Sequence, residues 1–290
     1  MKKYFVCSDI HSHYNELMAA LNEAHFDTNN PEHILIVLGD IFDRGDQSIE
    51  VYNFLRSLPL SRRVLVLGNH ESLLIELVRR RAVTSADHYN GTYKTLTHFY
   101  KDPRKEQNKW LEDNHDKYTY MDRQRLSQDI FREVFRELFT NEKIKEVISW
   151  ILSNEWVPYY ELGKYIFVHS FIPLITTDEV FQTVKYNPHW RTNSTPQEIE
   201  DAKWMCPHRL YKAGLFSEEE KNGKVLVCGH WHTSDFYNEL LYFNEPSKQL
   251  DIHKDNPIFK SEKYPGLIGI DACTALTKKV NILVINEDEL

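Results

Sequence analysis

Short apolar runs alternate with stretches of helical periodicity along the first third of the chain. Continuous apolar residues predict strands, and these fall at residues 3–8, 33–38 and 62–67. Helical spacing of apolar residues predicts helices at 14–23 and 48–58, and a third helix that begins with ESLLIELVRRR at residue 71. Strands rich in Val, Ile and Leu that alternate with helices are typical of a sheet covered on both faces. The pattern therefore predicts an α/β fold.

The rest of the chain divides into a polar middle and an apolar end. Residues from about 82 to 160 are polar, aromatic and charged, which predicts a helical insertion over one edge of the sheet, with helices around 121–139 and 142–153. Strands are then predicted at 164–169, 224–229, 266–271 and 280–285. Because no Gly/Ser-rich linker separates these parts, we expect a single domain over residues 1–290.

Composition narrows the possible partners. The formal net charge of −8 argues against broad affinity for nucleic acid or a membrane surface, since both attract a basic face. No apolar run approaches the roughly 18 residues that span a bilayer, and the N-terminal apolar stretch is too short for a signal peptide. The four cysteines are scattered and form no CxxC pair, as expected of reduced thiols. We therefore expect a cytoplasmic protein.

Metal-capable side chains follow five of the predicted strands. Ligands in open α/β sheets bind beyond the carboxyl ends of the strands, so these side chains are expected to converge at one rim. The chain also carries fourteen histidines, and imidazole is the commonest transition-metal ligand. In chain order, the residues are Asp9 and His11, Asp40 and Asp43, Asn69 and His70, His169, and His230 and His232.

The types of side chain in this set favour particular metals. Asp, His and Asn without thiolate suit Mn²⁺, Fe or Zn²⁺ better than Ca²⁺, and we expect Mn²⁺ first. The set is too large for one ion, whereas two ions roughly 3.5–4 Å apart could share one carboxylate. Any single Asp here could instead cap a helix or close a turn, so the inference depends on the whole set.

Five motifs in order resemble the calcineurin-like metallophosphoesterases. They read DIHSHYNEL, GDIFDRG, GNHE, FVHS and GHWH. Within this family the chain is most similar to phosphoprotein phosphatases of the bacterial and phage type. Residues 3 to 76 match densely, whereas 82–160 match nothing. The resemblance implies a layered β-sandwich of mixed sheets flanked by helices.

The resemblance also implies a set of metal ligands. A first metal would bind Asp9 and His11, Asp40 would bridge both metals, and a second metal would bind Asn69, His169 and His230. His232 matches the second histidine of the GHxH motif in the wider superfamily, where that residue joins the first metal.

Three further roles concern catalysis and substrate. By resemblance, Asp43 orients His70, which protonates the leaving oxygen, and Arg44 grips the phosphate. The chemistry agrees, because a guanidinium can donate two parallel hydrogen bonds to phosphate oxygens and an imidazolium can act as a general acid. Arg191, in HWRT, matches a Trp-Arg pair whose arginine touches phosphate, although it could equally be an ordinary loop residue.

We therefore expect a binuclear metal-dependent phosphoesterase that hydrolyses phosphomonoesters by attack of a metal-bridging hydroxide. A phosphorylated protein is the first-choice substrate. A nucleotide substrate, such as a dinucleoside polyphosphate or a cyclic nucleotide, is the alternative, and a non-catalytic metal-binding scaffold is a third possibility. The chain departs from the family pattern at Ser12, at Ser170-Phe171 and at Ala272-Cys273, where the pocket rather than the metal set would change.

Overall fold

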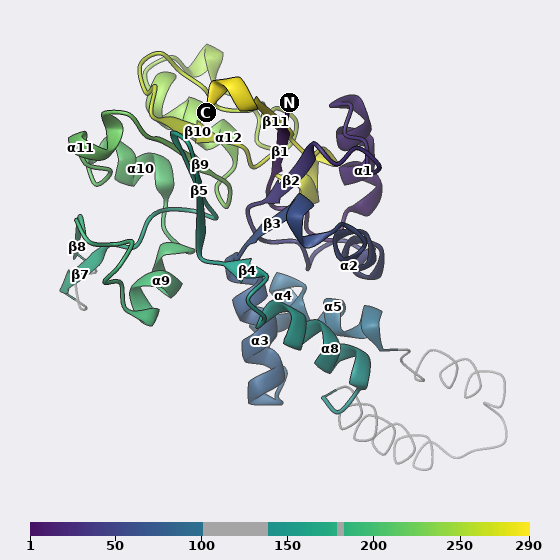
Figure 1. The fold of residues 1–290 in the computed structure, drawn as a ribbon. Helices are drawn as coiled ribbons and strands as arrows, with labels where there is room; N and C mark the ends of the chain where they lie inside the picture. The colour runs from purple at the N-terminus through teal and green to yellow at the C-terminus, as the bar shows by residue number, and fades with distance from the viewer. Residues whose placement is uncertain (101–138, 179–182) are drawn as a thin grey trace, which may run out of the picture.

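Two facing sheets form the centre of the computed structural model, which describes residues 1–100, 139–178 and 183–290 (Figure 1). The first sheet has the order β11 (Leu283–Asn286), β1 (Lys3–Cys7), β2 (His33–Val37), β3 (Arg63–Val66) and β4 (Trp156–Val157). The second has the order β10 (Leu267–Gly269), β9 (Val225–Cys228), β6 (Tyr165–Val168) and β5 (Tyr159–Leu162). A separate hairpin joins β7 (Ile175–Asp178) and β8 (Thr183–Lys185).

Most neighbouring strands run parallel, which places their carboxyl ends at a common edge. Strands β1 to β4 are parallel to one another, and so are β6, β9 and β10. The outer strands β11 and β5 are antiparallel to their neighbours. Because β11 pairs with β1, the two chain termini lie close together in Figure 1. The loops after β1, β2 and β3 therefore leave the first sheet on the same side.

The apolar strands are buried on both faces, as their composition predicts. In β2, Ile34 and Ile36 pack between the sheets, whereas Leu35 and Val37 face the outer helices. Side chains alternate between the two faces of a strand, so a continuous apolar run suits a strand covered on both sides. The sandwich of mixed sheets with flanking helices is the predicted fold class.

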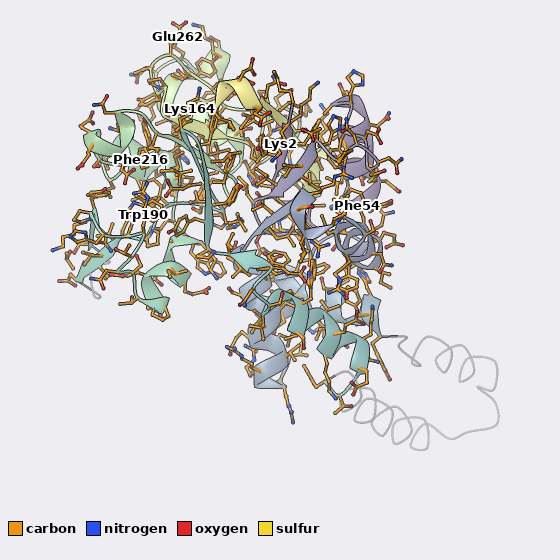
Figure 2. All side chains as sticks on the ribbon, in the orientation of Figure 1. Lys2, Phe54, Lys164, Trp190, Phe216 and Glu262 are labelled. Carbon is orange, nitrogen blue, oxygen red and sulfur yellow. The ribbon has the colours of Figure 1, made fainter. Side chains whose placement is uncertain are left out.

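Helices cover the outer faces of both sheets. The first sheet is covered by α1 (Tyr14–Glu23), α2 (Ser48–Ser57), α3 (Asn69–Arg80), α5 (Thr92–Phe99) and α8 (Glu142–Ile151), and the second by α10 (Pro207–Lys212) and α12 (Thr233–Phe236). Figure 2 shows Phe54 on the side of the first sheet and Trp190 and Phe216 on the side of the second. Within the described residues, the other α-helices are α4 (Ser85–Asn90), α9 (Pro196–Ala202), α11 (Glu218–Lys221) and α13 (Thr274–Thr277). Short 3-10 helices span Leu60–Arg62, Pro246–Lys248 and Glu287–Glu289, and a π-helix spans Tyr237–Leu241.

The predicted elements agree with the structure except at a few boundaries. The helix predicted from residue 71 begins at Asn69, which places Asn69 and His70 in its first turn. The helix predicted at 142–153 is α8, whereas the one at 121–139 lies almost entirely outside the described residues.

The insertion predicted to be helical up to residue 160 ends earlier than expected, because β4 pairs with β3 and β5 with β6. Within the described residues, no helix combines the length and apolar character needed to cross a bilayer. The expectation of one domain over residues 1–290 stays a prediction.

Candidate metal centre

The backbone is strained where the predicted ligands follow the strands. Several non-glycine residues adopt positive φ, which costs an L residue of order 1 kcal/mol or more. Such residues cluster at functional sites when the surrounding fold holds them in place. The rim residues concerned, with φ between 47° and 73°, are Asp9, His11, Ser12, Asp40, Asp43, Arg44 and His230.

Two glycines allow the carboxylates of the cluster to approach the backbone. A Cβ atom on Gly68 would lie 2.2 Å from Oδ1 of Asp40, and one on Gly229 would lie 2.3 Å from Oδ2 of Asp9. The glycines of the GN and GH motifs therefore leave room for these two carboxylates. The strand ends can then meet at a shared polar centre.

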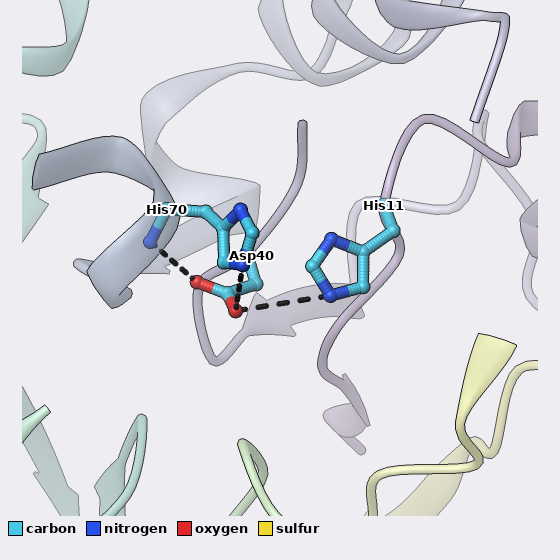
Figure 3. A group of neighbouring side chains, drawn as sticks. All are labelled: His11, Asp40 and His70. Atoms are coloured by element: carbon cyan, nitrogen blue, oxygen red, sulfur yellow. Dashed lines mark hydrogen bonds and ion pairs between the residues drawn. The ribbon is translucent and has the colours of Figure 1, made fainter. Parts of the chain in front are cut away.

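Asp40 lies at the middle of this centre. His11 and His70 form one metal-capable group with it, and His169 and His230 form another, with the ligand atoms in each group within 4.8 Å of one another. Figure 3 shows the rings of His11 and His70 directed at the Asp40 carboxylate, with Nε2 atoms 3.8 and 3.9 Å from Oδ2. On the other side, Nε2 of His169 lies 3.5 Å from Oδ1. One carboxylate is thus shared by two groups.

Backbone carbonyls orient two of these imidazoles. Nδ1 of His11 donates to the carbonyl of Phe42 at 2.9 Å, and Nδ1 of His169 donates to that of Leu38 at 2.6 Å. Nε2 is then the nitrogen with a lone pair, and it faces Asp40 in both cases. Burial lowers the pKa of His11 well below its ordinary value. Neutral imidazole is the form that binds a metal ion.

Asn69 contributes an amide to the second group. The amide atom that faces the cluster lies 2.8 Å from His169 Nε2, 3.1 Å from His230 Nδ1 and 3.2 Å from Asp40 Oδ2. These neighbours can accept hydrogen bonds, so an amide nitrogen at this position could donate to two of them, whereas the amide oxygen would suit a cation held at the same place. Burial lowers the pKa of His230 to about 3, which keeps that imidazole neutral. Carboxylate, imidazole and amide ligands together fit a first-row divalent metal.

Asp9 and His232 lie at the edges of the cluster. Oδ2 of Asp9 accepts a hydrogen bond from the backbone N–H of His230 at 2.9 Å, which joins the loop after β1 to the loop after β9. Nε2 of His232 lies 3.9 Å from Oδ2 of Asp271, and its side chain keeps 27% of its exposure. Neither residue is in the two metal-capable groups found within the described ranges.

The cluster holds more buried carboxylates than nearby cations. Burial raises the pKa of Asp9 to about 6, with a further contribution from the Asp40 carboxylate, and burial together with the Asp9 carboxylate raises the pKa of Asp271 well above its ordinary value. Uncompensated buried anions are costly, and a bound cation would relieve that cost. The five carboxylates, each no more than 2% exposed, belong to Asp9, Asp40, Asp43, Glu71 and Asp271.

Glu71 holds the loop that carries Asp40. Its Oε2 accepts hydrogen bonds from the N–H groups of Asp40 and Gly68, both at 2.9 Å, and its Oε1 accepts one from Ile41 at 2.9 Å. Glu71 is the last residue of the GNHE motif, and the pattern alone predicts no role for it. The GNHE motif therefore contributes a residue that holds the Asp40 loop as well as a candidate metal ligand.

His70 is held differently from the other histidines. Its Nδ1 donates to Oδ2 of Asp43 at 2.6 Å instead of to a carbonyl. Burial opposes protonation of this imidazole, but the carboxylates of Asp40 and Asp43 outweigh it and raise the pKa of His70. The exposed Arg44 lies across the mouth of the cluster, with Nη1 2.9 Å from His11 Nε2 and Nη2 3.2 Å from His70 Nε2. The structure thus brings Asp43, His70 and Arg44 together beside Asp40.

Two threonines of helix α5 complete the surroundings of Asp43. Thr92 Oγ1 donates to Asp43 Oδ2 at 2.9 Å, and Thr95 Oγ1 donates to Oδ1 at 2.6 Å. Neither threonine is among the predicted site residues, because both lie in the segment that matches no known motif. The only signal was their i, i+3 spacing, which places two hydroxyls on one face of a helix.

Ser12, one of the departures from the family pattern, also reaches this helix. Its hydroxyl lies 2.8 Å from that of Ser48, which in turn lies 2.8 Å from Nδ1 of His98 in α5. The loops after β1 and β2 are therefore both linked to α5.

In the structure, the guanidinium of Arg191 bonds to residues outside the cluster, and its predicted role as a phosphate contact stays a prediction. Its guanidinium bonds to the carboxylates of Glu161 and Glu220 and stacks on Trp190, with Cζ 4.2 Å from the ring centroid. Glu161 pairs with Ile166 of β6, whereas His169 follows the opposite end of that strand. At roughly 3.3 Å per residue, three residues separate the two ends by about 10 Å. The local HWRT pattern carried no information about which end of the sheet it would join.

Comparison with known proteins identifies the family. The sequence model described as calcineurin-like phosphoesterase matches residues 2–234. A symmetrical bis(5'-nucleosyl)-tetraphosphatase of Buchnera aphidicola subsp. Baizongia pistaciae is 43% identical over 77 residues, which cover 27% of this chain and 26% of that protein. The enzyme of the same name from Proteus mirabilis is 39% identical over 71 residues, covering 24% and 25%. The matched region thus spans about a quarter of these relatives' length.

A solved structure shows the same fold. The cold-active protein-tyrosine phosphatase of a psychrophilic Shewanella species superposes with a TM-score of 0.52 at 15% identity, over 99% of this chain and 76% of that one. The motif order, the two sheets and the cluster around Asp40 agree with these findings. This chain therefore belongs to the calcineurin-like phosphoesterases, a family of metal-dependent phosphoester hydrolases.

Proposed function

We propose that this chain hydrolyses phosphoesters at a binuclear metal centre built around Asp40. The observation that carries the proposal is the position of this carboxylate, which belongs to two separate metal-capable groups. Two divalent ions, when bound, would neutralise phosphate oxygens and activate water near neutral pH. Mn²⁺ is the first metal to test, followed by Fe and Zn²⁺.

The ligands fall on the two sides of Asp40. Asn69, His169 and His230 would hold one metal, since a ring nitrogen of each imidazole lies within 3.1 Å of the amide. His11 would hold the other on the opposite oxygen. Asp9 and His232 would complete that position from the loops after β1 and β9.

The partner of each Nδ1 atom distinguishes the imidazoles proposed as metal ligands from the one proposed as the proton donor. A backbone carbonyl fixes the neutral tautomer of His11 and of His169, as suits ligands. The carboxylate of Asp43 instead favours the protonated imidazole of His70, as suits a general acid for the leaving oxygen. Arg44, exposed at the mouth, is placed to donate two hydrogen bonds to the phosphate.

Dinucleoside polyphosphates replace phosphoproteins as the first candidate substrate. The relatives that share 39–43% identity over 71 to 77 residues are named symmetrical bis(5'-nucleosyl)-tetraphosphatases. Phosphoproteins and a non-catalytic metal-binding scaffold are the other candidates. The presence of His70, Asp43 and Arg44 in contact argues for turnover over a scaffold.

A competition between substrates tests the proposal. The purified protein would be loaded with Mn²⁺ and given equal concentrations of diadenosine tetraphosphate and a phosphoserine peptide, and products would be quantified by chromatography. We expect a higher kcat/KM for the tetraphosphate, and a chelator should abolish turnover. A preference for the peptide would overturn the substrate assignment, and no hydrolysis of either with Mn²⁺, Fe or Zn²⁺ would favour the scaffold.

A further inference from the structure

The inserted segment carries part of the support for the proposed general acid. We infer that Thr92 and Thr95 of helix α5 are positioning residues, which hold the Asp43 carboxylate in the orientation that aligns His70 with the leaving oxygen. This inference rests on the role proposed above for His70. It assigns a function to a segment in which the sequence shows no motif.

The Asp43 carboxylate is wholly enclosed and fully hydrogen-bonded. Asp43 is 0% exposed, Thr92 is 0% exposed and Thr95 is 1% exposed. Oδ2 accepts from both His70 Nδ1, at 2.6 Å, and Thr92 Oγ1, at 2.9 Å, whereas Oδ1 accepts from Thr95 Oγ1 at 2.6 Å. An ionised carboxylate only accepts hydrogen bonds, so both hydroxyls must donate to it.

Thr95 fixes the rotation of the Asp43 side chain. Its oxygen accepts a hydrogen bond from the backbone N–H of Asp43 at 3.0 Å while its hydroxyl proton goes to Oδ1 of the same residue. The backbone and carboxylate of Asp43 are thereby held by one hydroxyl. Asp43 has a left-handed φ of 73°, which is strained for a residue other than glycine. The contact with Thr95 also helps to hold this backbone conformation.

The start of helix α5 packs closely against the loop that carries Asp43. A Cβ atom on Gly91, directly before α5, would lie 2.5 Å from the backbone nitrogen of Arg44. Lys94 forms an ion pair with Asp46 and also donates to the carbonyl of Arg44 at 3.3 Å. Helix α5 is therefore docked along the whole DRGD sequence, and its threonine hydroxyls are fixed relative to Asp43.

The dependence of the rate on the leaving group tells whether the threonines position the general acid or only stabilise the fold. A general acid speeds departure of a poor leaving group, whereas p-nitrophenolate leaves as a stable anion without a proton. We expect Thr95→Val to lower kcat about 10-fold for phenyl phosphate and to change kcat for p-nitrophenyl phosphate less than about 3-fold. Thr95→Ser keeps the hydroxyl and should restore both rates.

Matched variants make the result decisive. Thr97→Val removes a hydroxyl from the same helix that bonds only locally, to the carbonyl of Lys94 at 2.7 Å, and should leave both rates unchanged. Thr92→Ala offers a milder variant if Thr95→Val does not fold. In an Asp43→Asn background, Thr95→Val should add little, since both residues act through one carboxylate.

Three outcomes are informative. The positioning role would be overturned if Thr95→Val lowered kcat equally for phenyl phosphate and p-nitrophenyl phosphate. It would also be overturned if the kcat values of Thr95→Val matched those of Thr97→Val. If His70→Ala shows the leaving-group dependence and neither threonine variant does, this inference fails while the proposed function stands. If His70→Ala itself shows no such dependence, the proposed general acid is wrong. All these assays use monoesters, so they are independent of whether dinucleoside polyphosphates are the natural substrate.

Discussion

Oε2 of Glu71 accepts a hydrogen bond from the backbone N–H of Asp40 at 2.9 Å. This bond ties the loop after β2 to the first turn of α3, and two more bonds, to Gly68 and Ile41, make Glu71 the acceptor for three buried N–H groups. The shared carboxylate of the metal centre is thus held in place by a residue that would bind neither metal nor substrate.

We predict that Glu71→Ala destabilises the fold. Each buried N–H left without an acceptor costs about 1–3 kcal/mol, so the loss should be at least about 3 kcal/mol. Chemical denaturation measures it directly. Glu76→Ala, in the exposed ion pair with Arg80 on the same helix, should change the unfolding free energy by less than about 1 kcal/mol. Similar effects of the two substitutions would contradict the role of Glu71.

The shared position of Asp40 predicts unequal metal loss. Asp40→Ala should lower bound metal from about two ions per chain to well below one, because both groups lose a ligand. His169→Ala, which touches only one group, should leave about one ion per chain. Elemental analysis after dialysis against Mn²⁺ gives the stoichiometry. Equal loss in both variants would mean that the two positions do not share Asp40.

The two candidate arginines should behave differently. Arg44→Ala removes charge-assisted hydrogen bonds to phosphate and should lower kcat/KM about 10- to 100-fold. Arg191→Ala should change kcat/KM less than about 3-fold, because its guanidinium is already held by Glu161 and Glu220. Steady-state kinetics on one substrate compares them. A large loss for Arg191→Ala would restore the contact expected from the HWRT motif.

Buried His208 predicts a loss of stability in mild acid. Burial lowers the pKa of His208 to about 4, from about 6.5 in an unfolded chain. Between these values the unfolded state takes up a proton that the folded state does not, so stability falls as the pH drops from about 6.5 to 4. The contribution is up to about 3 kcal/mol.

The pH dependence of thermal unfolding tests this effect. His208→Gln should flatten the curve between about pH 6.5 and 4, whereas His189→Gln, at an exposed position, should leave its slope unchanged. An unaltered slope in the His208 variant would assign the acid sensitivity to other groups.

The sequence alone predicts the position of those site residues that directly follow a strand. Asp40 and His169 follow continuous apolar runs, and parallel strands bring such positions to one edge whatever the order of the strands. Arg191 shows the limit of this reasoning, because it lies in a loop that no strand fixes at either edge. Thr92 and Thr95 show another, since their role exists only after α5 docks on the DRGD loop. The local pattern of apolar residues predicts helices, strands and the ends of strands. The docking of helix α5 depends instead on contacts between residues far apart in the sequence.

The contact of Ser12 with Ser48 affects which substitutions its loop can accept. The φ of Ser12, 58°, is a conformation that glycine adopts without strain and that costs a serine free energy. The serine keeps this conformation while its hydroxyl is linked through Ser48 to His98. A change to glycine would relax the loop yet cut one of its tethers to α5, so the conformation of this loop and the docking of helix α5 are coupled through one side chain.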